Sequence, residues 1–173
     1  METLSLQPDK TVASLIHVSA FSKYFIPFGN FIIPLILWTA KKNDPFVDSH
    51  GKQALNFQIS IFLYFVFLVC AGIAGVVIMG FDIAAADPSF FREENFSLHP
   101  LRAMPLITIV GITGLLLLTL FILEIVAVIN AAIKASEGKT YKYPLTINFI
   151  TPTPVGIHQS KNDQFNNTQK QTL

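Results

Sequence analysis

Long apolar stretches alternate with short polar ones along the chain. Residues 59–81 form an uncharged run of twenty-three residues. As a helix rising about 1.5 Å per residue, this run is about 35 Å long and crosses a hydrocarbon core of about 30 Å. Residues 105–133 form a second run, in which Glu124 is the one charged residue. Both runs are predicted to be transmembrane helices, the second starting at Pro105, because proline suits the first turn of a helix.

A third apolar stretch, residues 15–40, is interrupted. It contains Pro27 and Gly29 near its middle, and proline removes a backbone donor and clashes with the preceding helical turn. The stretch therefore predicts two half-helices of about 18–20 Å, each too short to cross a bilayer alone. Two arrangements follow: a single kinked crossing, or a re-entrant hairpin that enters and leaves on one side.

These patterns predict an all-α integral membrane protein with two clear transmembrane helices and a broken N-terminal hydrophobic segment. A single membrane domain over residues 15–150 would lie between a polar tail, 1–14, and a disordered polar tail, 151–173. Within that domain we expect an outer loop at 82–104 and an extended interfacial segment at 141–150, whose tyrosines suit the headgroup belt.

Lysine and arginine positions predict the orientation, since cytoplasmic loops are enriched in both. Six lysines fall on one side: Lys41, Lys42, Lys52, Lys134, Lys139 and Lys142. A crossing first segment leaves Lys10, Arg92 and Arg102 opposite, a 6 to 3 distribution, and a re-entrant segment moves Lys10 across, giving 7 to 2. Both distributions predict a multi-pass protein with a cytoplasmic C-terminus.

The composition narrows the class of protein further. Charged residues make up 13% of the chain, about half the usual share of about 25%. The net charge of +1 excludes charge-driven nucleic-acid binding, so we expect the lipid bilayer and no nucleic acid as partner. A lone cysteine, Cys70, excludes an internal disulfide framework.

Glu124 is the most unusual intramembrane residue. It lies nine residues before Ile133, or about 14 Å inward, near the middle of the membrane. A carboxylate at this depth is expected to be protonated, paired or hydrated, with His17, Lys23 and Asn30 as candidate partners. It is either a proton or cation site or a neutral acid hydrogen-bonded between helices.

Gln53 and Asn56 lie at helical spacing just before the first long apolar run. They are predicted to pack against the broken first segment or to line a wet vestibule. Asp48 or Ser49 is the expected N-cap of this helix.

Small residues recur every four positions in both predicted spans, a spacing that lets helices approach closely in lipid. The members of these rows are Ala127, Ala131 and Ala135 in one span and Ala71 and Gly75 in the other. They pack either within the chain or in a homo-oligomer.

No arrangement of residues predicts catalysis, a cofactor or a metal. A zinc site needs three or four converging ligands, whereas His17, His50, His99 and His158 are scattered along the chain. No serine, histidine and acid form a nucleophile motif. We expect a protein that is not an enzyme and binds no cofactor.

Three stretches within residues 12–70 and 115–150 resemble a known family. They are residues 17–20 (HVSA), 24–30 (YFIPFGN) and 34–38 (PLILW); 41–42 (KK), 45–48 (PFVD) and 50–58 (HGKQALNFQ); and 131–135 (AAIKA), 137–139 (EGK), Tyr141 and 143–147 (YPLTI). In them the chain resembles a bacterial family of small membrane proteins similar to the twenty-kilodalton subunit of the chloroplast inner-envelope (Tic) translocon.

The resemblance implies a protein of the bacterial inner membrane with about three hydrophobic segments. It favours a translocon-like, non-enzymatic component that binds or assembles other membrane proteins. The alternative is a small oligomeric channel or proton-coupled transporter that uses Glu124 and the helix break at Pro27 and Gly29.

Overall fold

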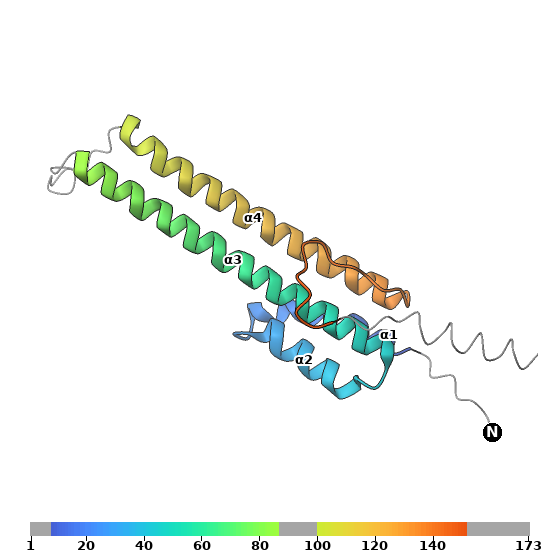
Figure 1. Cartoon of the computed structure of the whole chain (residues 1–173). Coiled ribbons are helices and arrows are strands. Elements are labelled where there is room, and N and C mark those ends of the chain that lie inside the picture. The colour runs from blue at the N-terminus through green and yellow to red at the C-terminus, as the bar shows by residue number, and fades with distance from the viewer. Residues whose placement is uncertain (1–7, 87–99, 152–173) are drawn as a thin grey trace, which may run out of the picture. The chain divides into compact units, whose positions relative to one another are not determined.

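The computed structural model describes residues 8–86 and 100–151 (Figure 1). Over these residues the chain is helical and contains no strand, so the predicted all-α fold is confirmed. The elements are α1 (Lys10–Val18), the 3-10 helix η1 (Ser19–Tyr24), α2 (Gly29–Lys41), α3 (Pro45–Ala86) and α4 (Pro100–Ser136). Two stretches, Pro45–Ala85 of α3 and Met104–Ser136 of α4, are long and apolar enough to cross a membrane. The predicted outer loop and C-terminal tail lie largely outside the described residues.

The broken N-terminal segment folds back on itself. The chain leaves helical geometry between η1 and α2, where Phe28 has a left-handed φ of 58°, a conformation that side chains with a Cβ adopt rarely. Helices α1 and α2 then pack against one another. Val12 and Ile16 of α1 share one apolar cluster with Trp38 near the end of α2. The two half-helices thus form a helical hairpin, and whether this segment crosses the membrane or re-enters stays a prediction.

The long helices extend beyond the apolar runs that predicted them. Asp44 caps α3, because its Oδ1 accepts from the amides of Phe46 (2.8 Å) and Val47 (3.4 Å). The predicted caps were wrong: Asp48 and Ser49 lie inside the helix. Helix α4 begins at Pro100, so Pro105 is an internal residue and not the start. Polar residues before an apolar run remain helical here because they have tertiary partners.

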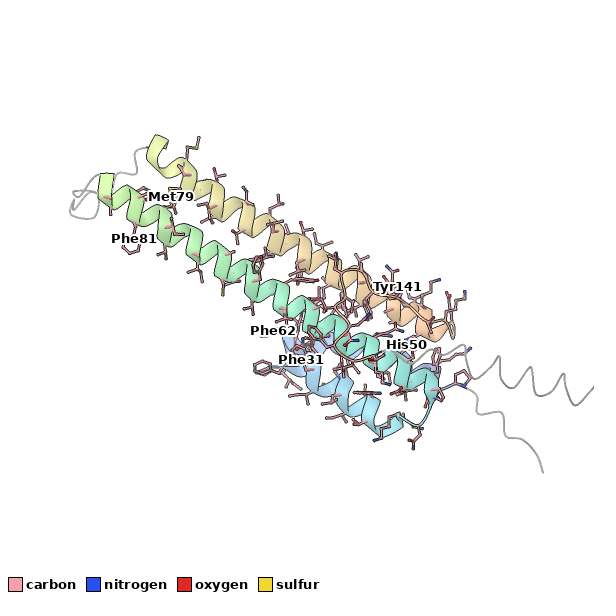
Figure 2. All side chains as sticks on the ribbon, in the orientation of Figure 1. Phe31, His50, Phe62, Met79, Phe81 and Tyr141 are labelled. Atoms are coloured by element: carbon pink, nitrogen blue, oxygen red, sulfur yellow. The ribbon has the colours of Figure 1, made fainter. Side chains whose placement is uncertain are left out.

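The chain divides into two structural units, each packed mainly against itself. The first comprises residues 1–60 and 125–173, and the second comprises residues 61–124. In the first unit, the extended segment after α4 runs beside the start of α3 (Figure 1). In the second, side chains of α4 approach the glycines of α3: a Cβ on Gly72 would lie 2.8 Å from Thr113 Cγ2. Most large apolar side chains of this unit are exposed along both helices (Figure 2), as lipid-facing residues are.

Gly51 provides a stability prediction for the first unit. A Cβ at this position would lie 2.4–2.7 Å from three atoms of Trp38, so Gly51→Ala is expected to lower the free energy of unfolding by about 1–3 kcal/mol through overpacking. The chain contains one tryptophan, and its fluorescence during thermal unfolding in detergent reports this contact directly.

The matched control for Gly51→Ala is Gly80→Ala. Gly80 is also within α3, and no described atom lies within 4 Å of a Cβ placed there. This substitution is expected to be neutral or to stabilise the helix slightly, since alanine has the higher helix propensity. Equal melting temperatures for the two variants would contradict the close packing of Trp38 on Gly51.

Candidate functional site

A buried hydrogen-bonded chain of three side chains connects three segments of the first unit. His17 of α1 lies at its centre: its Nε2 is 2.7 Å from His50 Nδ1 of α3, and its Nδ1 is 2.8 Å from the Tyr143 hydroxyl. Both histidines are fully buried, and Tyr143 is 5% exposed. We call these three residues the Tyr143–His17–His50 chain. Its two hydrogen bonds connect His17 to residues that lie 33 and 126 positions further along the sequence.

His17 is held in its neutral form. Burial, and secondarily the nearby His50, lowers the pKa of His17 to about 3. A neutral imidazole has one donor and one acceptor nitrogen. Either Tyr143 donates to His17 and His17 donates to His50, or both bonds run in the opposite direction. In both cases His50 Nε2 has no hydrogen-bond partner among the described residues.

Polar side chains of α3 also bind the backbone that follows α4. The Asn56 amide donates to the Ile150 carbonyl (2.7 Å) and accepts from the Ile150 amide (2.8 Å). The Ser60 hydroxyl accepts from the Ile147 amide at 2.8 Å. Phe57 stacks on Tyr143 with ring centroids 4.1 Å apart. An extended segment without a strand partner therefore has its backbone groups satisfied by side chains.

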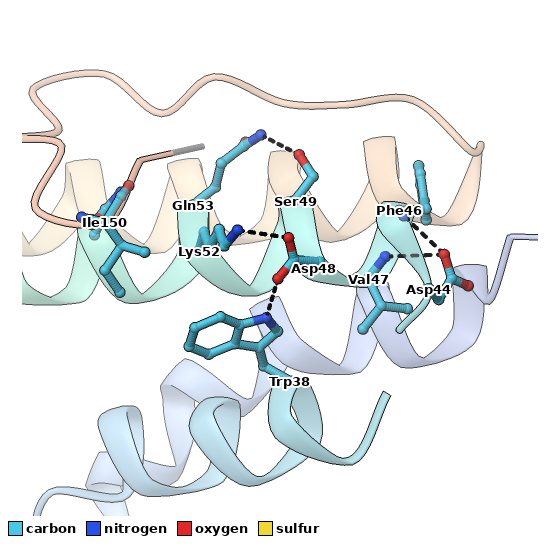
Figure 3. A network of polar contacts seen from close by, with 10 residues as sticks. Trp38, Asp44, Phe46, Val47, Asp48, Ser49, Lys52, Gln53 and Ile150 are labelled. Atoms are coloured by element: carbon cyan, nitrogen blue, oxygen red, sulfur yellow. Dashed lines mark hydrogen bonds and ion pairs between the residues drawn. The ribbon is translucent and has the colours of Figure 1, made fainter. Parts of the chain in front are cut away.

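A second polar cluster connects α2 to α3. The Trp38 indole donates to Asp48 Oδ1 at 2.8 Å, and Lys52 forms an ion pair with Asp48 Oδ2 at 2.7 Å (Figure 3). Both side chains of the ion pair are mostly buried, so the carboxylate has partners on both oxygens. Asp48 thus orients α2 against α3 and is not the helix cap that the sequence predicted.

The surroundings of the intramembrane candidates are described within each unit. His17 is bonded within the chain just described, and the Asn30 side-chain amide donates to Gln58 Oε1 at 3.0 Å. Lys23 is half-buried, with its ammonium 5.3 Å from the Tyr24 ring centroid. Glu124 is 3% exposed. Its pairing with His17, Lys23 or Asn30 and its role as a proton or cation site stay predictions.

The helix break and the small-residue rows are placed as follows. Pro27 is exposed within the turn, whereas Gly29 is buried at the start of α2. Ala127, Ala131 and Ala135 of α4 are buried, and Ala135 lies in a cluster with Ala13 and Phe46. In α3, Gly75 lies close to Ile109 and Ala71 is exposed. Ala127, Ala131 and Gly75 are thus packed against other residues of the same chain. A role of the small-residue rows in a homo-oligomer stays a prediction.

Among residues 8–86 and 100–151, no three His, Cys, Asp or Glu side chains converge as metal ligands. The polar groups are arranged for hydrogen bonding instead. Sequence reasoning considered His50 only as a metal ligand and Tyr143 only as a headgroup residue. The signal it missed was the pairing of two histidines and a tyrosine in apolar surroundings, where each must find a neutral partner.

Taken together, the fold and this site define a membrane-embedded, all-helical protein with two candidate spans and a tightly hydrogen-bonded polar unit. A family model matches residues 8–150, and the chain belongs to that family, the magnetosome magnetite crystal formation proteins (MamF/MmsF).

This assignment corrects the resemblance to the translocon-like family. The match covers all three stretches on which that resemblance was based. Apolar and aromatic segments of membrane proteins are alike in many families, because the bilayer imposes the same composition on them. No curated protein and no solved structure gives a match to the chain.

Proposed function

We propose that this protein is a non-enzymatic membrane component of magnetite crystal formation that binds and organises other proteins in the membrane around the crystal. The family assignment supplies the process. The observation that supports a structural role is the use of the polar residues: His17, Asn30 and Asn56 are bonded to other segments of the same unit. Side chains bonded in this way position helices and are not presented to a substrate.

The proposal is tested in a magnetite-forming bacterium whose own copy of the protein is deleted. Deletion is expected to change the distribution of crystal diameters measured by electron microscopy, and the wild-type chain is expected to restore it. Tagged protein, crosslinked in native membranes, should recover the same membrane proteins in repeated purifications. Normal crystals after deletion, or no reproducible partner, would overturn the proposal.

Proton-coupled transport through Glu124 is the second candidate function. It is supported by the burial of a carboxylate within a candidate span, and formation of magnetite from dissolved iron and water releases protons. The same strain discriminates the two functions. Under the structural proposal Glu124→Gln restores normal crystals, whereas under the transport alternative it folds but fails to restore them and abolishes proton flux in liposomes.

The proposed orientation places the C-terminus in the cytoplasm, because the lysine-rich segments favour that side. Reporter fusions after Leu173 and at Asn95 are expected to report opposite sides of the membrane, with Leu173 cytoplasmic. A fusion at Met1 distinguishes the two arrangements of the first segment: a hairpin places Met1 on the side of Leu173. Fusions at Leu173 and Asn95 that report the same side would refute the two spans.

A further inference from the structure

A cavity of about 350 Å³, lined by residues with polar side chains, lies within the first unit, beside the segment that follows α4. This volume is at the lower end of the range for small-molecule sites. Its lining residues are Gln53 of α3 together with Lys142, Tyr143, Thr146 and Asn148. We call it the Lys142 cavity. Glu124 and the members of the small-residue rows are not among these lining residues.

Two buried polar atoms of these lining residues have no hydrogen-bond partner in the part of the chain that the structure describes: Gln53 Oε1 and Thr146 Oγ1. The Gln53 amide nitrogen donates to Ser49 Oγ at 3.2 Å (Figure 3), which leaves the amide oxygen as the available acceptor. Buried polar groups are almost always hydrogen-bonded. A ligand that supplies the missing partners is therefore favoured.

The lining residues also specify the charge of such a ligand. Lys142 is the one basic side chain among them, and none of the described residues that line the cavity has a carboxyl group. Lys142, Thr146 and Asn148 can donate to anionic oxygens, whereas Gln53 Oε1 requires a donor. The complementary ligand has a negatively charged group with several oxygens and, next to it, a hydrogen-bond donor.

The position along the chain indicates where such a group is found. Gln53 lies six residues before the apolar run that starts at Ile59, or about 9 Å along the helix. Since lipid headgroups extend about 5–8 Å beyond each side of the hydrocarbon core, Gln53 lies at the outer edge of the headgroup layer. The geometry points to a binding site for a phospholipid phosphate whose headgroup alcohol carries a hydrogen-bond donor, such as ethanolamine or glycerol. The phosphate binds Lys142 and Thr146, and the donor binds Gln53.

The test is calorimetric titration of the full chain in detergent with two short-chain lipids. Phosphatidylethanolamine and phosphatidylcholine have the same phosphate and formal charge, but the quaternary ammonium of choline has no N–H donor. Ethanolamine lipid is expected to bind about tenfold more tightly, the equivalent of one hydrogen bond of about 1.4 kcal/mol. Gln53→Met should abolish this preference.

Two variants address the phosphate. Thr146→Val and Lys142→Gln are each expected to weaken the binding of both lipids several-fold. The matched controls are Thr140→Val and Lys139→Gln, because both residues are exposed and lie outside the lining of the cavity; they should bind like the wild type. Lys142 is itself exposed, so its substitution tests the site even if Thr146→Val fails to fold.

Inorganic phosphate serves as the third ligand and separates the two sources of phosphate. Weaker binding of inorganic phosphate than of ethanolamine lipid supports a lipid site. Equal binding with the same dependence on Lys142 and Thr146 supports the phosphate chemistry and assigns a free anion as the ligand. Lipid binding that is the same in wild type and variants, or no binding of any ligand, overturns the proposal. Water would then be the hydrogen-bond partner of Gln53 Oε1 and Thr146 Oγ1.

Discussion

His17→Ala is expected to lower the free energy of unfolding by about 3 kcal/mol or more. The substitution removes the hydrogen bond that His17 makes with the Tyr143 hydroxyl and the one it makes with His50 Nδ1, and the loss of a buried partner costs about 1–3 kcal/mol. It also leaves a cavity at a fully buried position. Thermal or denaturant unfolding in detergent, followed by Trp38 fluorescence, measures the loss.

A double-mutant cycle separates the energy of the hydrogen bond between His17 and Tyr143 from the energy that is lost with the packing of His17. Tyr143→Phe removes only the hydroxyl, and in the His17→Ala background it removes a group that has already lost its hydrogen bond to His17. The double variant should therefore be more stable than the sum of the two single effects predicts, by about 0.5–3 kcal/mol. Tyr141→Phe is the matched control, since Tyr141 contacts Tyr143 through its ring and is expected to be additive. Additivity of His17→Ala with Tyr143→Phe would contradict the chain of hydrogen bonds.

The apolar runs predicted the fold well because the bilayer leaves few alternatives. A chain in lipid must satisfy its backbone within each segment, so uncharged runs such as 59–81 become helices whatever their partners are. The interruption at Pro27 and Gly29 likewise marked a real break, which the structure places between η1 and α2. Both features depend only on the local sequence and on the apolar core of the bilayer, which imposes the same constraint on every segment.

The candidate site was harder to predict because it depends on distant pairs. Nothing near His17 in the sequence indicates that His50 and Tyr143 are its partners, 33 and 126 residues away. The start of α3 at Pro45 was also missed, because a polar stretch is helical here only with tertiary support from Trp38 and from the backbone of Ile150. Composition and periodicity do not report such contacts.

Mild acid is expected to destabilise the folded chain through His17. Burial lowers the pKa of His17 to about 3, whereas in the unfolded chain it is about 6.5. Below pH 6.5 the unfolded state therefore binds a proton that the folded state does not, and the free energy of unfolding falls as pH falls toward 3. Between pH 7 and pH 5 this one group contributes a loss of about 2 kcal/mol.

The measurement for this pH dependence is the unfolding free energy at pH 7, 6 and 5, a range above the usual pKa values of carboxyl groups. His17→Gln preserves a polar side chain but cannot titrate, so the slope of its profile should be smaller by close to one proton. A wild-type profile that is flat, or one that His17→Gln leaves unchanged, would show that His17 is hydrated in solution. The Tyr143–His17–His50 chain would then not be the dry connection between α1, α3 and the segment after α4 on which the structural role depends.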